Sequence, residues 1–146
     1  MKRKYELTGE TKELCEATLH RIRALIDFND VKAGDLGGWV ENEDNLSHNG
    51  DAWVYGNAHV LGNAKVYGNA CVFGNALVYD DARVFGNAWV YGNARVFGNA
   101  KVSGNAEIYD NALVFGDAWV YRNARVYGNA RVFGNAEIYG NAWVFE

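Results

Sequence analysis

The chain has 146 residues, a formal net charge of −4 and no proline. Apolar residues make up 49% of it and aromatic residues 14%, which excludes a disordered chain and allows one ordinary folded domain. The mild negative charge argues against a nucleic-acid polymer as the partner, since proteins that bind such polymers are usually strongly basic.

The start of the chain, Met1 to Glu6, is basic, but no apolar segment follows it, so no signal peptide is expected. No apolar run approaches the roughly 20 residues that a membrane-spanning helix needs. Cys15 and Cys71 are too few for a disulfide framework and are expected to be reduced thiols. Together these features predict a cytoplasmic protein without a membrane partner.

Residues 1–50 differ in pattern from the rest and are interpreted as an N-terminal β cap, which a solenoid needs at its end. Three strands are expected in this region, at residues 5–7, 18–26 and 31–40. The last two would flank a hairpin turn at Phe28-Asn29-Asp30. Val40 and Leu46 lie six residues apart, which predicts an irregular start of the repeats that follow.

Residues 51–146 form the repeat region. From Ala52 onward they follow the six-residue pattern Ala-x-(Val/Ile)-(Tyr/Phe)-Gly-Asn without an insertion. In a strand, Ala and Val/Ile point to one face, and x and the aromatic residue point to the other. Because x is often Lys, Arg or Glu, the aliphatic face must be the core and the rings must lie outside. The Gly-Asn pair is typical of a turn, since both residues tolerate positive φ.

This pattern resembles the hexapeptide repeat of left-handed parallel β-helix proteins, where a small residue follows an aliphatic one by four positions, as Ala58 follows Val54. The resemblance implies an all-β fold of triangular coils with 18 residues each, so the sixteen hexapeptides would make about five coils. The beginning of the chain is also similar to small hexapeptide proteins of phages and prophages, often labelled transferase-like. The segments that carry this second likeness are residues 21–25, 31–41 and 45–47.

With three hexapeptides per coil, the outward x residues stack in three columns, and one column brings cations and rings together. Cations beside aromatic faces suit an anionic, ring-bearing ligand such as a nucleotide. The other interpretation is that these cations are solvated and their stems merely cover the rings. Ser103 would leave a notch in the ladder of rings. The candidate ligand-binding residues are Lys65, Arg83, Lys101, Ser103, Tyr67, Phe85 and Tyr121.

The outward aromatic residues have two interpretations. Stacked rings stabilise a sheet through contacts on one face, but so much exposed aromatic surface is also typical of an interface. The candidate interface residues are Trp53, Trp89, Trp119, Trp143 and Phe145. The final coil would present unpaired strand edges, which predicts a homo-oligomer through that coil or through the aromatic faces.

The resemblance also implies an alternative function, because many hexapeptide β-helix proteins are acyltransferases that use a histidine as general base and acyl-CoA as donor. His59 is the one histidine at an outward repeat position, so it would be that base. However, the repeats have no extruded loop, and no partner for His59 is evident. We therefore favour a non-catalytic binding or scaffold protein without a cofactor, which sequesters a small anionic ligand or a host protein. No metal site is expected, since the Cys and His residues lack the spacing of zinc ligands.

Overall fold

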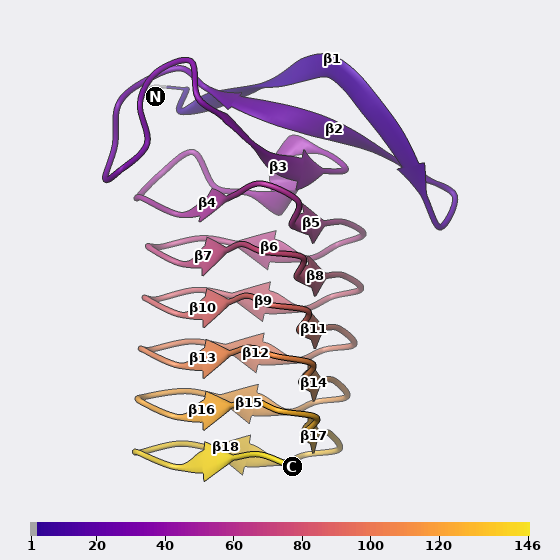
Figure 1. Cartoon of the computed structure of the whole chain (residues 1–146), viewed down its shortest axis with the longest axis vertical. Helices are drawn as coiled ribbons and strands as arrows, with labels where there is room; N and C mark the ends of the chain where they lie inside the picture. The colour runs from indigo at the N-terminus through magenta and orange to yellow at the C-terminus, as the bar shows by residue number, and fades with distance from the viewer. Residues whose placement is uncertain (1–2) are drawn as a thin grey trace.

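A computed structural model describes residues 3–146, so Met1 and Lys2 of the basic start lie outside it. The chain forms a β-solenoid of stacked coils with an antiparallel cap over its N-terminal end (Figure 1). The cap contains β1 (Tyr5–Leu14), β2 (Ala17–Ala24) and β3 (Leu36–Val40), and the 3-10 helix η1 (Glu43–Asn45) follows. None of the helices in residues 3–146 is long and apolar enough to cross a membrane.

Sixteen two-residue strands build the solenoid, one from each hexapeptide. They are β4 (Trp53–Val54), β5 (His59–Val60), β6 (Lys65–Val66), β7 (Cys71–Val72), β8 (Leu77–Val78), β9 (Arg83–Val84), β10 (Trp89–Val90), β11 (Arg95–Val96), β12 (Lys101–Val102), β13 (Glu107–Ile108), β14 (Leu113–Val114), β15 (Trp119–Val120), β16 (Arg125–Val126), β17 (Arg131–Val132), β18 (Glu137–Ile138) and β19 (Trp143–Val144).

The repeat strands pair in parallel with the strands one coil away, which confirms the predicted coil of three hexapeptides. They form three sheets, which we call the β5 sheet (β3-β5-β8-β11-β14-β17, with the cap strands at its end), the β6 sheet (β6-β9-β12-β15-β18) and the β4 sheet (β4-β7-β10-β13-β16-β19). The pairings determine the coil length but not its hand, so the left-handed winding stays a prediction.

The irregular start of the repeats is confirmed, and it adds a coil to the predicted number. Val40 in β3 pairs with Val60, and Leu46 forms a parallel bridge with Val66. Each of these contacts spans 20 residues instead of the 18 that separate later partners such as Val60 and Val78. The first coil is therefore made of β3, Leu46 and β4 and carries two extra residues between Leu46 and β4.

The predicted division between the two faces of the hexapeptides is confirmed, except that the outward residues Trp53, Cys71 and Ser103 are also buried. Val102 and Ala100 are fully buried, whereas Lys101 between them is exposed. The turns use positive φ, as at Gly86 (φ 67°), where a Cβ would lie 2.8 Å from the backbone nitrogen of Gly104 in the next coil. The rings lie on the outside of the solenoid and stack from coil to coil.

The predicted turn at Phe28-Asn29-Asp30 is confirmed, since Phe28 and Val31 exchange backbone hydrogen bonds across it and the flanking strands β2 and β3 pair antiparallel. These two strands end earlier and begin later than predicted, so residues 25–35 form a loop around the turn. A second hairpin turn, which was not predicted, lies at Cys15-Glu16 and joins a ten-residue β1 to β2. Apolar and polar residues do not alternate clearly along β1, which explains why only residues 5–7 were predicted as a strand there.

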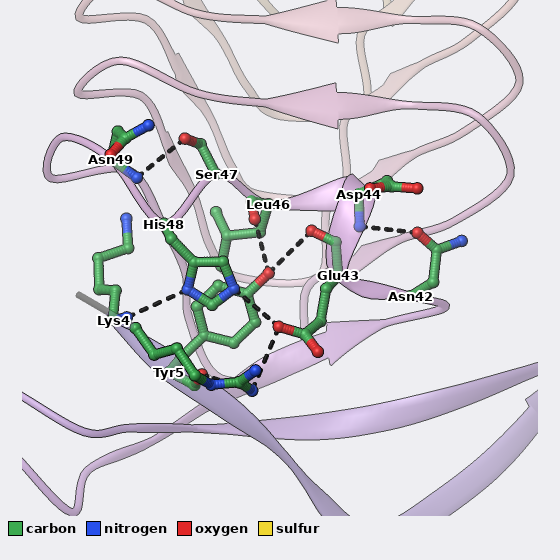
Figure 2. Close-up of polar contacts among 10 residues, drawn as sticks. Lys4, Tyr5, Asn42, Glu43, Asp44, Leu46, Ser47, His48 and Asn49 are labelled. Atoms are coloured by element: carbon green, nitrogen blue, oxygen red, sulfur yellow. Dashed lines mark hydrogen bonds and ion pairs between the residues drawn. The ribbon is translucent and has the colours of Figure 1, made fainter. Parts of the chain in front are cut away.

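Three buried side chains attach the cap to the first coil. Trp53 is 1% exposed, and its ring lies edge-on to Phe28 at 5.2 Å and to Tyr5 at 6.0 Å between centroids. The Tyr5 hydroxyl donates to the carbonyl of Leu46 at 2.6 Å (Figure 2). The buried Lys4 ammonium donates to the carbonyl of Ala52 at 2.6 Å, and removal from water lowers its pKa to about 8. The prediction that Trp53 is an interface residue is therefore wrong, because the cap covers it.

Candidate functional site

The three predicted cations form one ladder on the outside of the β6 sheet. Lys65 pairs with Arg83, and Arg83 pairs with Lys101, so their strands are direct neighbours. All three side chains are exposed, and none of them forms an ion pair with another residue in 3–146. We call these three residues the cationic ladder.

Two shallow hollows lie on either side of the cationic ladder. One, of about 540 Å³, is lined by all three cations together with Asn63, Asp81 and Asn99. The other, of about 560 Å³, is lined by Lys65 and Arg83, by Tyr67 and by residues of the first coil from Glu43 to Asn49. Lys65 and Arg83 therefore reach both hollows. The second hollow is also lined by the carboxylates of Glu43 and Asp44, so positive charge prevails only in the first, where three cations face Asp81 alone.

The predicted notch at Ser103 is filled. Tyr67 and Phe85 stack at 4.9 Å between centroids, as expected, but Ser103 in the next coil is only 6% exposed. The indole of Trp119 covers it and donates from Nε1 to Ser103 Oγ at 3.0 Å. Tyr121 then lies 4.7 Å from Trp119, so the aromatic surface continues past the serine. The substitution of a small residue is compensated by a large one in the neighbouring column.

His59 is half-buried in the β5 sheet, below the cap. Its ring stacks with Trp39 at 6.5 Å, and within residues 3–146 its buried Nδ1 has no hydrogen-bond partner. Removal from water and the nearby Lys12 lower the pKa of His59 to about 4. The imidazole is therefore neutral at pH 7, but it is a weak base, since an efficient base has a pKa close to the working pH.

A second histidine forms a carboxylate pair that the sequence did not predict (Figure 2). His48 Nε2 lies 2.7 Å from Glu43 Oε1, at the edge of one hollow beside the cationic ladder. However, His48 Nδ1 accepts the backbone N–H of Lys4 at 3.1 Å, and its ring stacks on Tyr5 at 4.2 Å. Because both ring nitrogens are engaged, His48 attaches the cap to the first coil and has no free nitrogen to accept a substrate proton.

A further hollow, of about 620 Å³, lies between the β1–β2 turn and the β5 sheet. Its walls include Leu14 and Cys15 from the turn and Leu77, Tyr79 and Arg95 from the sheet. The sequence could not reveal this hollow, because it depends on where the hairpin turns.

The remaining candidate interface residues lie on the surface of the solenoid. They are Trp89 (45% exposed), Trp119 (38%), Trp143 (61%) and Phe145 (63%). Trp89 and Trp119 lie on different sheets, so the structure does not bring the set together on one face. Their role in an oligomer stays a prediction.

Comparison with known proteins agrees with the fold. Residues 76–92, 88–104, 106–122 and 124–137 match a family model described as the YdcK β-solenoid repeat. A segment of 61 residues, 36% of this chain, is 38% identical to a protein of Escherichia coli K12 named "Uncharacterized acetyltransferase YdcK". The match covers 19% of that protein, so the chain spans about a fifth of the relative's length. The protein is thus a β-solenoid with YdcK-like repeats, consistent with the hexapeptide-repeat β-helix family.

Proposed function

We propose that this protein is a binding module whose cationic ladder holds a small anion that carries an aromatic ring, such as a nucleotide. The observation that supports the proposal is the set of three exposed cations on adjacent strands, none of which forms an ion pair within residues 3–146. Like charges about 5 Å apart repel one another even in water. A bound anion would relieve this repulsion, and the rigid coil would keep the cations in place for it.

The chemistry of each part suits such a ligand. The guanidinium of Arg83 can hold two phosphate oxygens at once, while the flanking lysines add charge. Trp119 is 38% exposed and lies beside Lys101, whose Nζ is 5.7 Å from the indole ring. The exposed part of that indole offers an aromatic surface on which the ring of the ligand can stack.

We expect Arg83→Ala to weaken the binding of AMP about tenfold in calorimetric titrations at low salt, the usual scale of a charge-assisted hydrogen bond. Lys101→Ala should weaken it less. Arg131→Ala, an exposed cation on the β5 sheet, is the matched control and should change the affinity less than about twofold. Adenosine and inorganic phosphate, tested alone, separate the contributions of the ring and the charge. Equal effects of the Arg83 and Arg131 variants would contradict the proposal, as would the absence of AMP binding.

Acyl transfer is the second candidate, because the E. coli relative is named an acetyltransferase. In that case acyl-CoA would be the donor, and the neutral His59 would accept the proton of the acceptor. We expect no thiol release above background when the protein is incubated with acetyl-CoA and a set of amine acceptors. Turnover that is lost in His59→Ala but retained in His20→Ala would favour the enzyme instead. A homo-oligomer and a host-protein partner stay predictions.

A further inference from the structure

A separate hollow of about 390 Å³ lies between the cap loop of residues 25–35 and the β4 sheet. It lies on another sheet from the cationic ladder and shares no residue with its two hollows. The residues that line it are Asn29, Asp30, Tyr55, Cys71, Phe73 and Trp89.

Three aromatic rings stand at nearly right angles around this hollow. Phe73 is central, with Tyr55 at 6.2 Å and 83° on one side and Trp89 at 5.7 Å and 78° on the other. Phe73 also stacks on Tyr91 at 4.7 Å and 3°, so one of its faces is covered. Tyr55 and Trp89 meet Phe73 edge-on and stand as two walls of the hollow.

The charge of the hollow is negative on its cap side. The Asp30 carboxylate accepts a hydrogen bond from the Tyr55 hydroxyl at 2.9 Å, which holds the acid at the rim. Burial, together with the nearby Asp30 and Asp51, raises the pKa of the Cys71 thiol, so the thiol is neutral. The neighbouring cation is Lys4, and its ammonium is already bound by the carbonyls of Gly50 and Ala52 at 3.2 and 2.6 Å.

We propose that the hollow lined by Asp30, Tyr55, Phe73 and Trp89 binds an organic cation with an alkylammonium head group. The faces of Trp, Tyr and Phe attract such a cation through their π electrons, and the carboxylate supplies the opposite charge. The volume of about 390 Å³ lies at the small end of the range for ligand sites, which suits a head group better than a large ligand. An anion would be repelled by Asp30.

Choline and 3,3-dimethylbutan-1-ol test the proposal, because the two molecules have the same shape and only choline is charged. In calorimetric or NMR titrations we expect choline to bind about 5- to 30-fold more tightly than the neutral alcohol. Equal affinity would show an apolar groove only, and no choline binding at millimolar concentrations would exclude the site. Either result would overturn the proposal without affecting the test with AMP.

Two variants locate the site. Asp30→Asn keeps an oxygen that can accept the Tyr55 hydroxyl but removes the charge, and Trp89→Leu removes one wall; each should weaken choline about fivefold or more. Trp143→Leu is the control, since it removes an exposed indole from the far end of the same β4 sheet and should leave choline binding unchanged. If Asp30→Asn and Trp143→Leu have the same effect, the proposal fails. A peptide with trimethyllysine, titrated in parallel, shows whether a site that binds choline binds the same head group more tightly on a protein side chain or on a free molecule.

Discussion

Val102→Asp is expected to prevent folding of the solenoid or to lower the free energy of unfolding by several kcal/mol. Val102 is fully buried in the middle of the prism, and its strand faces a core of alanine, valine and isoleucine. A carboxylate there would have no partner and no access to water. Urea unfolding followed by far-UV circular dichroism measures the loss.

The matched control is the adjacent residue. Lys101→Asp introduces the same side chain on the opposite face of β12 and should cost less than about 1 kcal/mol, mostly from the lost contact with Trp119. Val102→Thr has nearly the shape of valine and should cost about 1–3 kcal/mol, which keeps the comparison measurable if the Asp variant does not fold. Similar losses for positions 101 and 102 would contradict the division between inner and outer faces.

Trp53→Ala is expected to lower the free energy of unfolding by about 3–5 kcal/mol and to loosen the cap. Trp53 is the largest fully buried side chain, and it packs so closely that a Cβ on Gly37 would lie 2.7 Å from its ring. The cap strands β1 to β3 are already packed and cannot move into the cavity that the removal of the indole leaves. Hydrogen exchange should therefore accelerate most in β1, β2 and β3, in addition to the shift in the unfolding midpoint.

Trp143→Ala provides the comparison, since this indole is 61% exposed in the last coil. We expect it to cost less than about 1 kcal/mol and to leave exchange in the cap unchanged. If the two tryptophan variants were equally destabilising, or if exchange in β1 to β3 did not respond to Trp53→Ala, the packing of the cap on the first coil would be wrong.

The alternation within each hexapeptide could be determined from the sequence, because every unit repeats the same constraint. Charged residues at the x positions cannot lie in the core, so Val102 must point inward when Lys101 points outward. The resemblance to hexapeptide β-helix proteins gave three hexapeptides per coil. With that number the cationic ladder could be predicted, because every strand pairs with the strand 18 residues away in the same register. These are local rules, and they need no knowledge of distant contacts.

Only the tertiary structure decided where irregular segments meet the repeats. The turn at Cys15, the burial of Trp53 and the pairing of His48 with Glu43 all depend on how a nonrepetitive cap packs on the first coil. Trp119 covers Ser103 from the adjacent column, and Asp30 reaches the rings of the β4 sheet from a loop. A repeat specifies its own contacts with identical neighbours, whereas contacts between unlike segments are selected by packing of the whole chain.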